Sequence, residues 1–222
     1  PTLGNSYDLD IDVTLAPCIS DSYEANDSLN AASPISTGFT SNLTACPGDD
    51  DWYSIDLWVG DSLELDANFV HSEGDIDIYL FDPSESQVAQ STSVSNLETV
   101  THTATETGTY FLRARLYSDS GPLLGNPYSL GATVTAGDDG LEENDSSSNA
   151  LEVPGYRVDD LRVLSGDDDW YAVDLGVSDT LAVNVNFTDS EGDIDLYVYA
   201  PGSGGAGAMV RSSNGFNDNE ST

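Results

Sequence analysis

The sequence predicts an all-β protein built from two tandem β-sandwich domains, and three observations support this. The string Gly-Asp-Asp-Asp-Trp-Tyr at 48–53 recurs at 166–171, and 28 of the 63 ungapped pairs between 21–83 and 139–201 are identical at this offset of 118 residues. A repeat of that length is the size of a domain and not of a solenoid unit. Short apolar–polar alternations separated by turn residues, with no helical period, favour a β-sandwich.

Residues 1–14 read as a single strand that does not belong to the domain following it. Apolar residues alternate there with Asp8, Asp10 and Asp12, and the stretch matches 122–135 at an offset of 121. We therefore interpret 1–14 as the closing strand of a preceding or neighbouring repeat. The side chains that such a donated strand would insert into a partner are Tyr7, Leu9, Ile11 and Val13.

The first domain is expected to span 15–135. Alternation predicts strands at 52–57, 63–69 and 76–80, and a later strand at 109–116 precedes the turn at Gly121-Pro122. We expect Trp52 in the core of this sandwich, and its repeat counterpart Trp170 in the core of the second; the alternative is that both are aromatic side chains of a binding face. Trp58 has Gly176 as its counterpart, so it is a candidate for a contact peculiar to the first domain.

A short linker at 136–138 leads into the second domain, 139–222, which repeats these strands at 170–175, 181–187 and 194–198. The sequence stops at 220–222, equivalent to 98–100, so counterparts of 108–116 and 128–134 are missing. Residues 1–14 could replace only the second of these two strands. We expect either further residues or a longer covalent array, of which this chain is a processed or excerpted piece.

The charge excludes one large class of partner. The chain has 40 Asp and Glu residues against 5 Lys and Arg, with no lysine, for a net charge of −35. Such a surface repels phosphate and anionic lipid, which excludes nucleic acid, but it suits bound divalent cations or high salt. No apolar run of about 18 residues exists, so no membrane span is expected.

The two cysteines, Cys18 and Cys46, fall at the start of the first domain. We expect them to form a disulfide, which indicates an oxidising compartment and therefore a secreted or cell-surface protein. Two free thiols are the alternative.

Acidic and amide side chains that repeat at the unchanged offset of 118 predict a calcium site in each domain. Calcium binds six to eight oxygens from carboxylates and carbonyls. Asp49 and Asp51 lie two residues apart in an extended segment, so they share a face, whereas Asp50 points away. The alternative is a solvated acidic turn in which Asn26 or Asp27 caps a helical turn. The predicted ligands are Glu24, Asn26, Asp27, Asp49 and Asp51, and then Glu142, Asn144, Asp145, Asp167 and Asp169.

No catalytic constellation is present in the sequence, and we expect no enzyme. The string Gly-Asp-Ser-Leu at 60–63 is the signature of a class of esterases, but it opens a strand, and its counterpart is Ser-Asp-Thr-Leu at 178–181. Neither His71 nor His102 occurs in the context of a base for such a serine. Three sequons are candidate glycosylation sites, at Asn42, Asn186 and Asn219.

Each repeat resembles the bacterial and archaeal pre-peptidase C-terminal (PPC) domain. The matching motifs are Glu-x-Asn-Asp-Ser, Gly-Asp-x-Asp-Trp-Tyr, Gly-Asp-Ile-Asp-(Ile/Leu)-Tyr, Gly-Thr-Tyr-Phe-Leu-Arg and Asn-Pro-Tyr-Ser-Leu. Ala25 and Glu143 stand where the family usually has Pro. The resemblance implies a jelly-roll-like β-sandwich that folds alone and has no catalytic role. It also implies calcium binding and, in some relatives, binding of a fibrous substrate such as collagen.

The chain ends suggest a structural function. If residues 1–14 of one copy complete the second domain of another, the contact repeats head to tail and builds a calcium-stiffened extracellular filament or adhesive fibre. The alternative is a substrate-targeting or adhesion module excerpted from a secreted peptidase, which binds an extracellular protein or polysaccharide as a monomer.

Overall fold

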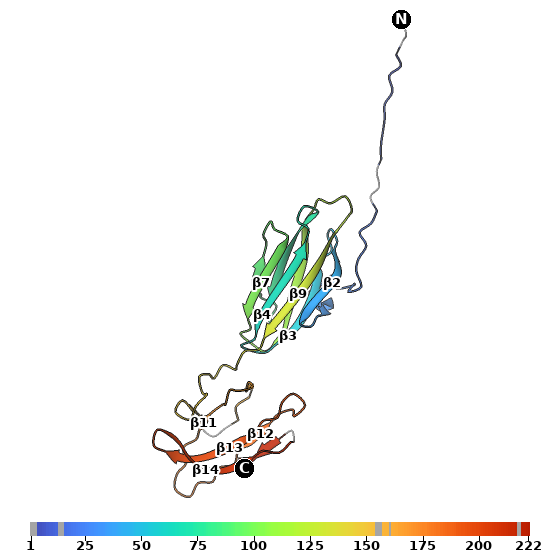
Figure 1. Cartoon of the computed structure of the whole chain (residues 1–222). Coiled ribbons are helices and arrows are strands. Elements are labelled where there is room, and N and C mark those ends of the chain that lie inside the picture. Colours follow the sequence, from blue (N-terminus) through green and yellow to red (C-terminus); the bar gives the residue numbers. More distant parts are fainter. Residues whose placement is uncertain (1–3, 13–15, 154–156, 160, 217–218) are drawn as a thin grey trace. The chain divides into compact units, whose positions relative to one another are not determined.

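The computed structural model of the chain describes residues 4–12, 16–153, 157–159, 161–216 and 219–222 (Figure 1). It divides into two compact units, Pro1–Gly137 and Asp138–Thr222. Within the described ranges, the only helical element is the 3₁₀ turn η1 (Leu29–Ala31). The all-β prediction is therefore confirmed. No helix in those same ranges is long and apolar enough to cross a membrane.

Unit 1 is a β-sandwich of two sheets that enclose one hydrophobic core (Figure 1). One sheet has five strands in the order β1-β3-β8-β5-β6, and the other has four in the order β2-β9-β4-β7. Their bounds are β1 (Ser33–Pro34), β2 (Gly38–Ala45), β3 (Asp51–Leu57), β4 (Ser62–Phe69), β5 (Gly74–Phe81), β6 (Gln87–Ser91), β7 (Leu97–Thr103), β8 (Gly108–Asp119) and β9 (Asn126–Thr135).

Strict alternation of side chains along the strands builds this core. In β3 the buried residues are Tyr53, Ile55 and Leu57, while Ser54 and Asp56 face the other way. In β4 the buried set is Leu63, Leu65, Ala67 and Phe69. Successive side chains of a strand point to opposite faces, so a period of two places one set between the sheets.

The prediction that Trp52 belongs to the core is wrong. Tyr53 faces inward, so Trp52 lies on the outer face, where its ring centroid is 5.2 Å from that of Phe81. The Arg113 guanidinium lies over the same ring at 5.9 Å. Trp170 is likewise only half-buried, and its ring is 5.1 Å from that of Tyr199.

Two strands are central to the sandwich of unit 1. β8 lies between β3 and β5 in the first sheet, and β9 lies between β2 and β4 in the second. Each therefore pairs on both edges and contributes fully buried side chains. Those of β8 are Tyr110, Leu112 and Ala114, and those of β9 are Tyr128, Leu130 and Ala132.

Unit 2 reproduces the pairings of unit 1 that do not need β8 or β9. Its strands are β10 (Leu151–Glu152), β11 (Tyr171–Ala172), β12 (Asn184–Asn186), β13 (Leu196–Gly202), β14 (Gly205–Ser213) and β15 (Asn219–Ser221). β10 pairs with β11 in parallel, as β1 does with β3 at positions 118 residues earlier. The paired residues Val185 and Glu220 correspond to Ala67 and Glu98 of unit 1. The segment that connects the two paired residues is therefore four residues longer in unit 2 than in unit 1.

The apolar side chains of unit 2 alternate as in unit 1 but are not sealed from solvent. Residues 181, 183, 185 and 187 are half-buried, whereas their counterparts Leu63, Leu65, Ala67 and Phe69 are buried. Among the described residues of unit 2, no hydrophobic side chain is fully buried. In the described part of unit 2 no strand takes the position of β8 or β9, the two strands that contribute buried side chains opposite this face in unit 1.

The described part of the N-terminal segment, residues 4–12, forms no regular secondary structure and is exposed. Tyr7, Leu9 and Ile11 are 83%, 72% and 70% exposed, which is unusual for large apolar side chains. Val13 lies outside the described residues. We refer to residues 4–12 as the arm.

Candidate metal centre

A turn before η1 and the loop before β3 meet in unit 1, and buried polar groups fix their relative position. The Trp52 backbone N–H donates to the Asn26 carbonyl at 2.9 Å, and Asn26 Nδ2 donates to the Trp52 carbonyl at 3.1 Å. One oxygen of Asp21 accepts from the Tyr23 N–H at 2.8 Å and the other from the Thr44 N–H at 2.9 Å. The Asn26 side chain therefore anchors the turn, although the sequence predicted it as a metal ligand.

These bonds bring three of the predicted ligands together. Carboxylate oxygens of Glu24, Asp27 and Asp49 all lie within 4.8 Å of one another. Burial raises the pKa of Glu24, and its hydrogen bond with Asp27 and the nearby Asp49 raise it further. Burial and the charge of Asp27 raise the pKa of Asp49. Burial is the larger cause of both shifts, and the closeness of like charges adds to it; a bound cation would relieve the second effect.

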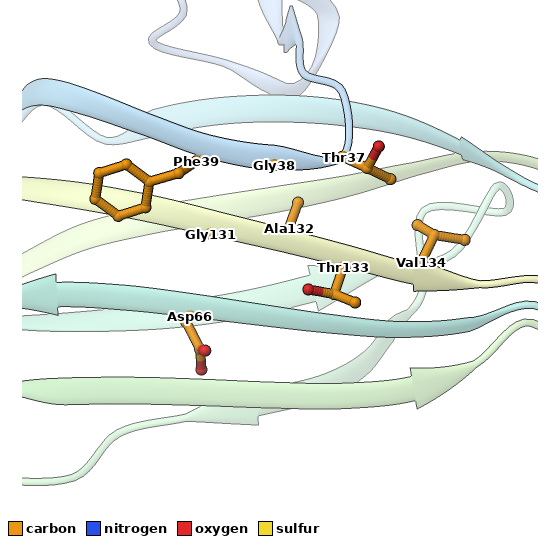
Figure 2. Close-up of a pocket in the computed structure, with 8 residues that line it drawn as sticks. All are labelled: Thr37, Gly38, Phe39, Asp66, Gly131, Ala132, Thr133 and Val134. Atoms are coloured by element: carbon orange, nitrogen blue, oxygen red, sulfur yellow. The ribbon is translucent and has the colours of Figure 1, made fainter.

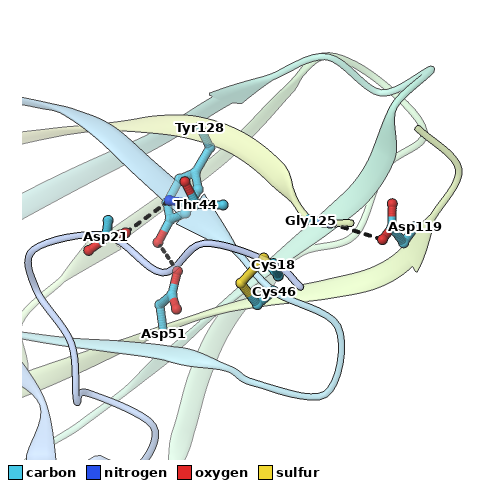
Figure 3. Close-up of a disulfide and its surroundings, with 8 residues drawn as sticks. All are labelled: Cys18, Asp21, Thr44, Cys46, Asp51, Asp119, Gly125 and Tyr128. Carbon is cyan, nitrogen blue, oxygen red and sulfur yellow. Dashed lines mark hydrogen bonds between the residues drawn. A yellow bond between two sulfur atoms is a disulfide. The ribbon is translucent and has the colours of Figure 1, made fainter. Parts of the chain in front are cut away.

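Asp51 lies deeper than this cluster and has a protein partner. It accepts a hydrogen bond from the Tyr128 hydroxyl at 2.5 Å (Figure 3). That hydroxyl is 2.6 Å from the hydroxyl of Tyr53. Burial raises the pKa of Asp51 to about 7; the Tyr128 bond opposes the rise, while nearby carboxylates, Asp21 first, add to it. Asp51 thus connects the loop to the central strand β9.

Unit 2 has a similar cluster with a different membership. Oxygens of Asp138, Glu142 and Asp169 lie within 4.8 Å of one another. The framework is partly that of unit 1, because the Asn144 backbone carbonyl accepts from the Trp170 N–H at 2.9 Å and Asp139 accepts from the Leu141 and Arg162 N–H groups, both at 2.8 Å. The Asn144 side chain, however, faces Glu142 and not the Trp170 carbonyl. Asp145 and Asp167 lie beside this cluster. A side-chain hydrogen bond with Asp145 raises the pKa of Glu142, and one with Asp138 raises the pKa of Asp167.

The pKa shifts in unit 2 show how closely the acids are packed. The Asn144 backbone N–H lowers the pKa of Glu142, but desolvation, Asp145 and Asp138 together raise it to about 7. Desolvation and the charges of Asp139 and Asp138 raise the pKa of Asp169 to about 6. Asp138 was missed by the sequence reasoning because its counterpart at the offset of 118 is Ser20, and the only signal was its place in an acidic pair with Asp139.

The chemistry of both clusters is that of a hard-cation site. Three carboxylates provide up to six oxygens, and calcium takes six to eight at 2.3 to 2.6 Å. In both units the backbone carbonyl of a buried Asn, Asn26 or Asn144, accepts from the N–H of the Trp that opens the next strand and so holds the two loops together. Neither cluster contains a histidine or cysteine that a transition metal would favour.

The other predicted positions fall as follows. Cys18 and Cys46 form a disulfide with a Cα–Cα distance of 5.8 Å, which ties the segment after the arm to the end of β2 (Figure 3). Asn42, Asn186 and Asn219 are all exposed. Trp58 is 45% exposed, just after β3.

A shallow depression lies on the outer face of the four-stranded sheet, across β2, β9 and β4 (Figure 2). Phe39 on β2 pairs with Gly131 on β9, and Gly131 pairs with Asp66 on β4. These three residues form a row across the sheet. Gly131 has no side chain, so the centre of this row is open. A Cβ built on Gly131 would lie 3.7 Å from the Cβ of Asp66, which is an ordinary contact.

Comparison with known proteins identifies part of unit 1. Residues 49–116, from the loop before β3 to near the end of β8, match the family described as bacterial pre-peptidase C-terminal domain. Unit 1 is similar to that family over this segment. The PPC match contains Asp49 and Asp51, whereas Glu24 and Asp27 precede it.

Two crystal structures are similar to part of the chain. One is the pre-peptidase C-terminal domain of a collagenase from Bacillus anthracis, with 20% identity, a TM-score of 0.39, and coverage of 46% of this chain and 94% of that one. The other is PliG, a periplasmic inhibitor of g-type lysozyme from Aeromonas hydrophila, with 10% identity, a TM-score of 0.37, and coverage of 47% and 96%. The search of curated protein sequences found no match.

Proposed function

We propose that the chain is a non-catalytic, extracellular structural protein, stabilised by calcium, which assembles head to tail when the arm of one copy adds as a strand to unit 2 of the next. One observation carries the proposal. Apolar side chains of unit 2 that alternate as in unit 1 remain half-buried, and no strand lies in the β9 position among the described residues of the unit, while the arm, whose sequence repeats β9, is extended and exposed.

The expected free energy of this contact is large. Burying Tyr7, Leu9 and Ile11, now mostly exposed, contributes about 1.5 to 3 kcal/mol for each side chain. The sum, about 5 to 9 kcal/mol, is comparable to the whole net stability of a domain. Main-chain hydrogen bonds to β12, the counterpart of β4, would add specificity, as in other cases of strand addition.

The geometry of this contact does not close on itself. The donor is the arm and the acceptor is unit 2, so each copy carries one of each, and the contact joins different surfaces of the two partners. Heterologous contacts of this kind extend into open assemblies unless a rotation closes a ring. Repetition of the same contact between the arm and unit 2 from copy to copy would build a filament.

Deleting residues 1–14 is expected to abolish assembly. Electron microscopy and sedimentation of the purified chain should show filaments or oligomers, and the shortened chain should remain monomeric. Leu9→Asp should act like the deletion because it places a charge among buried apolar groups. Asp8→Asn, on the opposite face of the arm, is the matched control and should assemble. Monomers from the intact chain would contradict the proposal.

Calcium binding is supported by the two carboxylate clusters. Each gathers three acids within 4.8 Å in a chain of net charge −35, and each is held by the same backbone bonds around a buried Asn. A divalent cation would offset the repulsion that raises the pKa values there.

Calcium is expected to raise the melting temperature of unit 1. At a free concentration about 100-fold above the dissociation constant, the stabilisation is about 2.7 kcal/mol, or roughly 10 °C for a domain of this size. Asp49→Asn should remove most of this response, whereas Asp56→Asn, an exposed change on β3 outside the cluster, should retain it. Thermal unfolding with calcium and with a chelator provides the measurement. An unchanged melting temperature would exclude the site.

A second candidate function is a targeting or adhesion module. It is favoured by the outer face of the five-stranded sheet, where Arg113 lies over the rings of both Trp52 and Tyr79. Aromatic and arginine side chains are enriched at protein interfaces. Retention of the chain on an extracellular polymer such as collagen or a polysaccharide, combined with a monomeric elution volume, would favour this function over assembly.

A further inference from the structure

A glycine in the middle of a central strand leaves a gap on the outer face of the four-stranded sheet of unit 1. Gly131 lies in β9, between Phe39 on β2 and Asp66 on β4. These three residues line the shallow depression of Figure 2, which has a volume of about 490 Å³. Glycine weakens the interior of a strand, and it often marks a bulge, a bend or the close approach of a ligand.

The fold of unit 1 does not require glycine at this position. A Cβ on Gly131 would lie 3.7 Å from the Cβ of Asp66, an ordinary contact, and the backbone there is not in the left-handed region that favours glycine. By contrast, a Cβ on Gly74 of β5 would lie 2.9 Å from a main-chain carbonyl oxygen, so that glycine serves the packing. In the matching N-terminal stretch the residue equivalent to Gly131 is Asp10. The reason for Gly131 therefore lies outside the fold of the sheet.

The side chains around the gap combine one apolar ring with hydrogen-bonding groups. Phe39 is 70% exposed, so its ring does not close the gap. On the other side, one carboxylate oxygen of Asp66 accepts from the Thr99 hydroxyl at 2.6 Å, which fixes the orientation of the carboxylate. Thr37 and Thr133 line the same depression and add two hydroxyl groups. Pockets that bind small molecules have this character, with an apolar surface and a few placed polar groups.

A second depression continues the first along β9. It has a volume of about 410 Å³, and its lining includes Asn42 of β2, Ser129 of β9 and Asn68 of β4. Ser129 pairs with Asn68 and lies two residues before Gly131, so the second row is on the same face of the sheet as the first. The central residue of each row is small, whereas the flanking residues are larger. We call the two depressions together the sheet trough.

The chemistry of the sheet trough fits a neutral sugar chain. The C–H groups on the face of a hexose ring pack against an aromatic ring, while the hydroxyls at its edge both donate and accept hydrogen bonds. Amides and hydroxyls can answer in both directions, and a carboxylate accepts. An anionic ligand is disfavoured by a chain of net charge −35 that has no lysine. A peptide strand is disfavoured too, because the main chain of β9 already pairs with β2 and β4 and offers no free edge.

We infer that the sheet trough of unit 1 binds a neutral oligosaccharide. One sugar ring would lie over Gly131 against Phe39, with its hydroxyls at Asp66, and the next would reach the amides of Asn42 and Asn68. The site uses neither the arm nor the carboxylate clusters, so the inference stands apart from strand donation. Its biological role rests on the targeting candidate, for which it names a ligand class and a surface. Single or assembled copies would thereby attach to a polysaccharide.

Titration calorimetry of the full chain with cellohexaose, chitohexaose, mannohexaose and maltohexaose tests the inference. At least one of these neutral hexasaccharides should bind with a dissociation constant of about 1 mM or tighter. Phe39→Ala should weaken that binding at least about tenfold, because it removes the ring on which the sugar stacks. Tyr117→Ala removes an aromatic side chain of similar exposure, 65%, from β8 in the other sheet, and it is the matched control. Its dissociation constant should stay within about twofold of the unmodified chain.

Gly131→Thr provides a second measurement, which separates a binding role from a structural one. The new side chain would fill the gap, so binding should weaken at least about tenfold. The melting temperature of unit 1 should be unchanged or higher, because threonine favours strands and the position has room for a Cβ. A glycine that served only the fold would give the opposite pattern, with a lower melting temperature and unchanged binding.

The outcomes separate this inference from the proposed assembly. Deletion of residues 1–14 should leave sugar binding unchanged even where it abolishes filaments. The inference is overturned if none of the four hexasaccharides binds, or if both Phe39→Ala and Gly131→Thr bind as the unmodified chain does. Loss of binding in Tyr117→Ala would place the site on the five-stranded sheet instead. Tighter binding of hexagalacturonic acid than of any neutral sugar would contradict the neutral ligand class.

Discussion

Replacing Leu63 by alanine is expected to lower the free energy of unfolding of unit 1 by about 3 to 5 kcal/mol, whereas the same change at its counterpart Leu181 should cost unit 2 less than about 1 kcal/mol. Leu63 is fully buried in β4 between the two sheets. Removing its side chain leaves a cavity that the surrounding strands can only partly fill. Leu181 is half exposed, so its removal transfers little apolar surface and creates no enclosed space.

Hydrogen exchange in the full chain, combined with urea unfolding, would measure this difference for each unit separately. The chain without residues 1–14 is the appropriate background, since an added arm would cover Leu181. Restoring the arm at a concentration where assembly occurs should then make Leu181→Ala costly. Equal losses at the two positions in the shortened chain would mean that unit 2 has a closed core of its own.

Most of the fold could be predicted from the sequence because alternation and repetition are local signals. The strands at 52–57, 63–69 and 76–80 all occur close to the expected bounds, as β3, β4 and β5. The prediction for Trp52 placed its side chain on the wrong face of β3. Ser54 and Asp56 already marked the face to which Trp52 belongs, but the size of the indole ring suggested burial. Its packing against Phe81 and Arg113 explains how it is half covered on an outer face.

The clusters of acids were less predictable, because their members come from loops whose approach depends on backbone hydrogen bonds. Spacing identified Glu24, Asp27 and Asp49, but it could not show that Asn26 turns inward to bond the Trp52 carbonyl. It also could not find Asp138, whose counterpart is a serine. Comparison of the two repeats detects only what they share, and the second cluster depends on a residue that they do not share.

Breaking the disulfide is expected to destabilise unit 1 by about 3 to 4 kcal/mol and to leave unit 2 unchanged. Cys18 and Cys46 are 28 residues apart, and closing a loop of that length restricts the unfolded chain by about this amount. The bond also holds the segment after the arm against the end of β2, close to Gly125 and Asp119 (Figure 3). The double variant Cys18→Ser/Cys46→Ser, compared with the unmodified chain by urea unfolding, provides the measurement.

Unit 2 offers an internal control for this experiment, because its residues at the equivalent positions are Ala136 and Leu164. A reducing agent should therefore lower the protection of unit 1 amides in hydrogen exchange without affecting unit 2. If both units lose protection, the reductant acts by some other route than this bond. If neither does, the disulfide contributes no stability, and its role is to anchor the arm. In that case reduction should change the concentration required for assembly and not the unfolding transition of unit 1.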